Sequence, residues 1–152
     1  TVQTAELPVH DERRLTWAAF AFPVGVGVVL SPWDDDFLGN ALYLGLPSLA
    51  IVTIVRPFSR SGAVAFGCAV ALALHLSLFT AWVRSQPPDG LIWLGYFFCL
   101  PGAALGSLIA ALLARVTPAG QAKMLALGAI ATGLGAGLSM IGLCSTLIYC
   151  TF

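Results

Sequence analysis

The sequence predicts an all-α integral membrane protein, a polytopic bundle of five transmembrane helices with the N-terminus in the cytoplasm and the C-terminus outside. Two observations support this prediction: five apolar stretches of similar length, and basic residues that gather on one set of loops. The stretches are residues 15–30, 37–55, 62–83, 91–114 and 124–147. Each is close to the ~20 residues that a helix needs to cross a hydrocarbon core of ~30 Å.

Composition separates this chain from soluble proteins. Hydrophobic residues make up 59% and charged residues 9%, against about 45–50% and about 25% in soluble domains. A soluble fold of this composition would expose large apolar patches. We therefore expect one membrane domain over residues 15–152, preceded by a polar cytoplasmic tail over residues 1–14.

The positions of the seven basic residues predict the orientation. Only Arg84 lies in a loop on the opposite side from the others. The other six are Arg13, Arg14, Arg56, Arg60, Arg115 and Lys123. Short basic loops stay in the cytoplasm, so the odd-numbered stretches should run outward. The bacterial inner membrane is the location that we expect.

The first stretch is the shortest of the five and contains Pro23. If it lay on the membrane surface, four spans would remain. A cleaved signal peptide is not expected, because no small-x-small site follows the apolar run. A chain that starts at Thr1 is instead consistent with loss of an initiator methionine.

The next three stretches carry tryptophan at their predicted outer ends, as expected for side chains at the headgroup level. Trp33 precedes the second stretch, Trp82 ends the third and Trp93 begins the fourth. This aromatic belt supports the helix boundaries independently of the charges.

The fourth and fifth stretches carry small residues at helical spacing. Gly102 and Gly106 lie four residues apart, as do Ala129, Gly133 and Gly137. Such ridges let helix backbones approach closely in lipid, where packing must come from direct contact. Two interpretations stay open: packing within the chain, or docking of a partner or a second copy.

The apolar stretches contain few side chains that could bind ions, transfer protons or catalyse a reaction. The interiors of the stretches contain no Asp, Glu, Lys or Arg, although such residues usually mark ion routes, proton relays or catalytic sites. Their absence argues against a cation-coupled transporter, a carboxylate protease or a metal-dependent lipid transferase.

His75, near the middle of the third stretch, is the one ionisable exception. We expect a neutral histidine that bonds to a backbone carbonyl, Ser139 or Thr132, with a role as ligand or proton-transfer group as the alternative. A protease with a Ser139–His75 pair is a remote alternative. Haem is disfavoured, since the second histidine, His10, lies in the tail. No cofactor is expected.

The four cysteines show neither a CxxC motif nor zinc spacing. They are Cys68, Cys99, Cys144 and Cys150. Soft-metal handling through Met140, Cys144, Cys99 and His75 is a minor alternative. Cys144 and Cys150 cannot pair within a regular helix, because six residues place them ~9 Å apart. A bridge between them would require the chain after Cys144 to unwind.

The loop after the first stretch is acidic, with Asp34, Asp35 and Asp36 in a row. Three carboxylates in a tight turn cannot all face one ion, and Ca²⁺ requires more oxygen ligands than these. A solvated loop is the simplest interpretation, with docking of a basic partner as the alternative.

Three function classes remain. The first, which we favour, is a non-catalytic protein that binds another membrane protein, as an accessory subunit or as an immunity-type protein against a membrane-acting toxin. The second is a small oligomeric transporter or channel with a polar route along Asn40, Tyr43, Tyr96 and Thr132. The third is a membrane-embedded enzyme that uses His75. Lipid surrounds the protein in each case, and none of them involves nucleic acid.

Overall fold

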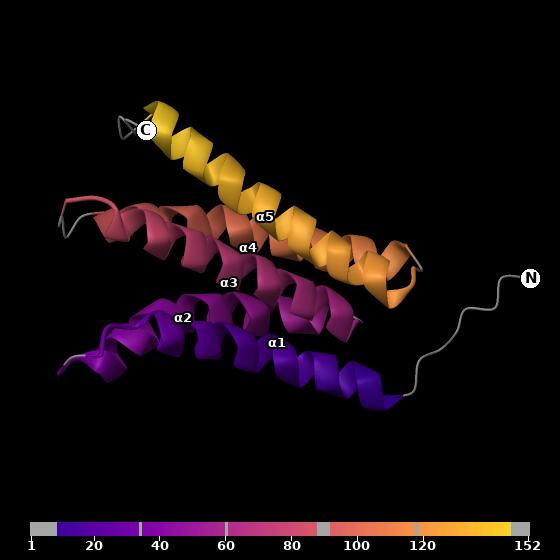
Figure 1. The fold of residues 1–152 in the computed structure, drawn as a ribbon. Helices are drawn as coiled ribbons and strands as arrows, with labels where there is room; N and C mark the ends of the chain where they lie inside the picture. The colour runs from indigo at the N-terminus through magenta and orange to yellow at the C-terminus, as the bar shows by residue number, and fades with distance from the viewer. Residues whose placement is uncertain (1–8, 34, 60, 88–91, 118, 147–152) are drawn as a thin grey trace, which may run out of the picture.

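The computed structural model describes residues 9–33, 35–59, 61–87, 92–117 and 119–146, and five long helices account for most of them (Figure 1). They are α1 (Val9–Leu30), α2 (Phe37–Val55), α3 (Gly62–Arg84), α4 (Ile92–Val116) and α5 (Gln121–Thr146), with a short 3₁₀ turn, η1 (Arg56–Phe58), after α2. All five are long and apolar enough to cross a membrane. The prediction of an all-α fold with five candidate spans is confirmed.

Two helices begin earlier than their apolar stretches. α1 starts at Val9, six residues before the predicted Leu15, and α5 starts at Gln121 rather than at Met124. Asp11 and Glu12 lie in the first turn of α1, where carboxylates interact favourably with the helix dipole. Polar residues at the membrane surface can therefore continue a helix that hydropathy alone would end.

Successive helices run in opposite directions, and side-chain contacts show which connections share an end of the bundle. Arg115, at the end of α4, donates hydrogen bonds to the carbonyls of Phe58 (2.6 Å) and Pro57 (3.1 Å) in η1. Arg84, at the end of α3, donates to the carbonyl of Leu30 (3.2 Å) at the end of α1.

These contacts define two ends of the molecule. The basic end holds the start of α1, η1 and the α4–α5 connection, and the opposite end holds Arg84. The basic residues described at the basic end are Arg13, Arg14, Arg56, Arg115 and Lys123. The fold therefore brings together the residues whose clustering the sequence predicted.

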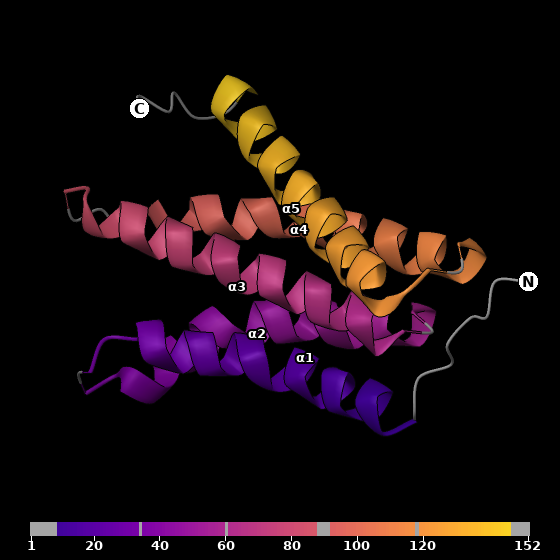
Figure 2. The same ribbon diagram turned by 45° about the vertical axis from the view of Figure 1, so that its right-hand side comes forward.

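α3 is the central helix. It contacts α1, α2, α4 and α5, and 67% of its apolar window is buried, against 17% for α1 and 22% for α5. In both views, α1 and α5 lie on opposite sides of α3 (Figures 1 and 2). α1 and α5 are thus the peripheral helices.

An aromatic cluster fills the core toward the opposite end. Tyr96 of α4 is fully buried, and the Phe79 ring lies 5.5–5.7 Å from the rings of Trp82, Trp93 and Tyr96. Trp82 and Trp93 therefore pack partly inward as well as marking the end of the bundle. Trp33, in contrast, is 84% exposed.

α5 crosses α4 obliquely, and its C-terminal end lies away from the other helices (Figures 1 and 2). Its first half packs on both α3 and α4. In the second half of α5, the side chains of Leu138 and Ile141 remain exposed when only the described residues are considered.

Candidate functional site: the faces of α5 and the membrane-embedded polar residues

Glycine on α4 brings the α4 and α5 backbones into direct contact. A Cβ atom at Gly102 would overlap the Gly135 carbonyl and the Ser139 side chain, and one at Gly106 would overlap the Ala131 carbonyl. These overlaps involve backbone atoms, which cannot move aside as a flexible side chain can. Gly102 and Gly106 thus pack inside the bundle.

A second close approach joins α5 to α3. A Cβ at Gly67 would overlap the Leu125 carbonyl, and a Cβ at Gly128 would overlap the Val64 carbonyl. The Cys68 thiol lies 3.8 Å from the Gly128 carbonyl, to which it donates a weak hydrogen bond. Sequence reasoning missed Gly67 and Gly128. The two glycines could be recognised as a contact only by knowing which helices pack together, because the pattern is one small residue on each of two adjacent helices.

The glycines expected to form the packing ridge of α5 face outward. A Cβ at Gly133 or Gly137 would meet no atom within 4 Å. The large side chains around them are 61–68% exposed, and together they form what we call the open α5 face. Its residues are Ile130, Gly133, Leu134, Gly137, Leu138 and Ile141. A cavity of about 520 Å³ continues this face toward Cys144 and Ser145.

The two predicted glycine pairs therefore differ in environment. Gly102 and Gly106 lie against α5, whereas Gly133 and Gly137 lie on the open α5 face. Within the described chain, the strip that packs α5 runs through Gly128, Ala131 and Gly135 instead. The two strips are offset around the same helix.

His75 does not make the predicted hydrogen bond. Its Nε2 atom is buried and has no hydrogen-bond partner among the described residues. Its ring stacks on Tyr96, with centroids 5.7 Å apart and planes inclined by 18°. The Thr132 hydroxyl bonds to Ser107 instead, at 2.8 Å, and the Ser139 side chain lies against Gly102 of α4. Ring stacking thus takes the place of the expected contact, and no Ser139–His75 pair forms.

The residues proposed for a polar route are engaged in separate contacts. The Tyr96 hydroxyl lies 3.3 Å from Ser48 Oγ, between α4 and α2. Thr132 is bonded to Ser107 between α5 and α4. Tyr43 packs edge-on against Phe97, with centroids 4.8 Å apart, and Asn40 lies in the first turn of α2. These contacts of Tyr43, Tyr96 and Thr132 are thus made to three different side chains.

No three or more His, Cys, Asp or Glu side chains come close enough to hold a metal ion within the described part of the chain. Cys68 and Cys99 are buried free thiols, whereas Cys144 is disulfide-bonded. α5 ends at Thr146, and Cys150 lies outside the described residues. The soft-metal alternative loses Cys144 as a ligand, because a disulfide sulfur is not a thiolate.

The acidic loop is described only in part, because Asp34 lies outside the described residues. Asp35 and Asp36 are exposed, and Asp36 occupies the N-cap position of α2. The Ser31 hydroxyl donates to the Phe37 carbonyl at 3.1 Å and closes the turn. The two described carboxylates belong to a short connection between α1 and α2.

No protein family, no curated protein and no solved structure matches the chain. What the protein does must be inferred from its own residues.

Proposed function

We propose that this protein is a non-catalytic inner-membrane protein that binds another membrane protein through the open α5 face. Such a protein would act as an accessory subunit, or as an immunity-type protein against a membrane-acting toxin. The observation that carries the proposal is the position of Gly133 and Gly137, which no part of the described chain covers.

Glycine has a cost in a helix that must be offset elsewhere. Each helical glycine destabilises the helix by about 0.8–1.0 kcal/mol relative to alanine. Gly102 and Gly106 offset this cost by allowing α4 and α5 to touch, but Gly133 and Gly137 receive no such contact. A helix of a partner protein, packed between the flanking side chains of Leu134 and Ile130, would supply it.

Two features of the molecule support an orientation with the basic end in the cytoplasm. Short basic loops are retained on the cytoplasmic side. The disulfide-bonded Cys144 lies near the other end of α5, and disulfides persist in oxidising compartments such as the periplasm. The open α5 face would then lie in the outer half of the membrane.

The transporter and enzyme alternatives receive less support from the described contacts. Tyr96 and Thr132 are bonded to separate serines, so a continuous polar route would have to break both pairs. His75 has an aromatic neighbour on its ring and no nucleophile bonded to Nε2.

Site-specific photo-crosslinking in the native membrane tests the proposal. A photoreactive residue at Gly137 should give one discrete protein adduct larger than the chain itself. The matched control is the same residue at Ile54, which is 64% exposed on α2. Gly133→Leu, which fills the face, should abolish the adduct, whereas Gly39→Leu, at an equally open glycine of α2, should not.

Three results would contradict the proposed function. Crosslinks to lipid alone would leave the face without a protein partner. Equal protein adducts from Gly137 and Ile54 would indicate non-specific collision. An adduct of twice the mass of the chain would identify self-association instead.

Impermeant maleimide labelling of intact cells tests the orientation separately. Arg84→Cys should react and Lys123→Cys should not, since both positions are exposed but lie at different ends of the molecule. The unsubstituted protein provides the background, with Cys68 and Cys99 buried. The reverse labelling pattern would overturn the orientation.

A further inference from the structure

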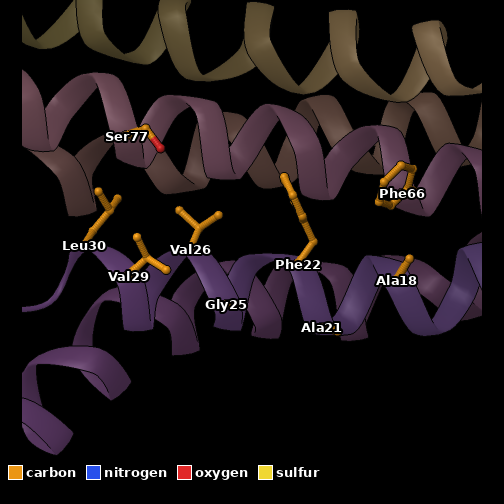
Figure 3. Close-up of a pocket in the computed structure, with 9 residues that line it drawn as sticks. All are labelled: Ala18, Ala21, Phe22, Gly25, Val26, Val29, Leu30, Phe66 and Ser77. Carbon is orange, nitrogen blue, oxygen red and sulfur yellow. The ribbon is translucent and has the colours of Figure 1, made fainter.

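An apolar groove runs between α1 and α3, on the side of the molecule away from α5 (Figures 1 and 3). Its volume is about 620 Å³. Phe22 of α1 and Phe66 of α3 meet edge to face within it, with centroids 6.0 Å apart. Leu30 and Ser77 lie toward its other end (Figure 3).

The floor of the groove is open because a glycine lies there. Gly25 lines the groove, and a Cβ atom at this position would meet nothing within 4 Å. The one hydroxyl in the lining, that of Ser77, donates to the carbonyl of Ala73 at 2.8 Å. The groove therefore offers apolar contacts, and the Ser77 hydroxyl does not need a hydrogen-bond partner from an occupant.

A cation stands at the end of the groove. Arg84 Nη2 donates to the carbonyl of Leu30 at 3.2 Å, and Leu30 lines the groove. The Arg84 side chain is exposed, and no ion pair joins it to another described residue. A guanidinium has five N–H donors, so one bond to a carbonyl leaves several for another acceptor.

We propose that this groove and Arg84 form a phospholipid-binding site, with an acyl chain along α1 and the phosphate on the guanidinium. Among the described residues, Arg84 is the one basic residue away from the basic end. Arginine binds phosphate through paired, charge-assisted hydrogen bonds. An acyl chain would supply contacts to α1, the least buried of the five helices.

Size argues for a lipid chain rather than a partner helix. The groove extends from Ala18 to Leu30, about 18 Å along the helix axis at 1.5 Å per residue. A helix is about 10 Å wide and much broader than an extended acyl chain, and a groove of about 620 Å³ suits the narrower occupant. The site is also separate from the open α5 face, so it does not depend on the proposed function.

Native mass spectrometry of the full chain in detergent tests the site, with phosphatidylglycerol and a diacylglycerol of the same acyl chains as probes. The protein should bind phosphatidylglycerol about tenfold more tightly, the effect of one charge-assisted contact. Arg84→Gln should remove this difference in affinity, whereas Arg84→Lys should retain part of the difference. The control Arg14→Gln alters an exposed arginine at the basic end and should leave it unchanged.

A second pair of variants tests the groove itself. Gly25→Leu should weaken binding of both probes by about tenfold or more, because its side chain occupies the place of the acyl chain. Gly39→Leu, at a glycine of α2 that is equally open, should bind as the unsubstituted protein does. Ala21→Leu, which also fills the groove, repeats the test if Gly25→Leu does not fold.

Equal affinity for the two probes would overturn the role of Arg84. Unchanged binding in both Gly25→Leu and Ala21→Leu would overturn the proposal that the acyl chain lies in the groove. An equal loss of binding in the control Gly39→Leu would do the same. A protein bound there in place of lipid would overturn the proposed occupant.

Discussion

The two peripheral helices are attached to the central helix in different ways, and the difference explains why each leaves a different free surface. α1 is joined to α3 by polar contacts at its two ends and by bulky apolar side chains, such as Phe22 and Phe66, between them. At the basic end, the Glu12 carboxylate accepts hydrogen bonds from the backbone N–H of Gly62 and the hydroxyl of Ser61. At the opposite end, Arg84 bonds to the Leu30 carbonyl.

α5 is instead held by backbone contact, to α3 near its start and to α4 further along, as far as Gly135. Gly67 and Gly128 allow it to touch α3, and Gly106 and Gly135 allow it to touch α4. Within the described residues, the side-chain hydrogen bonds that join α5 to its neighbours are those of Cys68 and Thr132.

Each mode of attachment leaves its own free surface. Bulky side chains rather than glycine lie between the middle of α1 and α3, and the groove lies beside the contact of Phe22 with Phe66. The contacts of α5 use one side of the helix, and the open α5 face lies on another side at the same levels. Tight and loose interfaces in one small bundle thus follow from where glycine and polar side chains fall.

The largest effect is expected from crowding the contact between α4 and α5. Gly106→Ala places a Cβ against the Ala131 carbonyl and should lower the free energy of unfolding in detergent by about 3 kcal/mol, as overpacking of a tight interface does. Gly133→Ala, on the open α5 face, is the matched control and should not be destabilising. Equal losses in both variants would show that the two strips of α5 do not differ in packing.

Removing the polar contact at the basic end of α1 should have the next largest effect. Glu12→Ala removes the acceptor of the Gly62 N–H at the start of α3 and should lower the free energy of unfolding by about 1–2 kcal/mol, as loss of a cap does. Glu12→Gln, which keeps an oxygen acceptor, should lose less. Hydrogen exchange should increase at the first turn of α3; unchanged exchange there would contradict attachment of α1 by its ends.

A smaller effect is expected for the one hydroxyl pair between α4 and α5. A double-mutant cycle with Ser107→Ala and Thr132→Ala should give a coupling free energy of about 0.6 kcal/mol, the average for hydrogen bonds inside a membrane protein. Thr53→Ala, whose hydroxyl bonds to Leu49 of its own helix, serves as the control with no such partner. A coupling free energy above about 2 kcal/mol would mean that the hydroxyl pair, rather than glycine packing, provides most of the stability of the contact between α4 and α5.

The smallest effect is expected in the groove. Gly25→Ala adds a methyl group where nothing lies within 4 Å and should raise the free energy of unfolding by about 0.5 kcal/mol, because it restricts the unfolded chain. Thermal unfolding in detergent would detect the change. A loss of stability instead would show that α1 and α3 are closer there than the structure has them.

The number of helices and their approximate positions could be predicted because apolar length alone decides what can span a bilayer. The helix faces could not. Gly133 and Gly137 were selected by regular spacing, but Gly128 and Gly135, on a neighbouring strip of the same helix, make the contacts. In lipid, both the packed and the exposed sides of a helix are apolar, so hydropathy does not distinguish them.

The surroundings of His75 were unpredictable for a related reason. Its neighbour Tyr96 is 21 residues away on another helix, and only the pairing of α3 with α4 brings the two rings together. The start of α1 was also missed, since hydropathy marks where lipid begins rather than where a helix does.

The place of α3 at the centre has a consequence for biosynthesis. A ribosome makes α5 last of the five helices, so α5 cannot cover Gly67 and Cys68 of α3 until its synthesis is complete. A chain truncated before Gln121 would leave this surface of α3 exposed permanently. Proteases that degrade misfolded membrane proteins would then be able to recognise and remove the truncated chain.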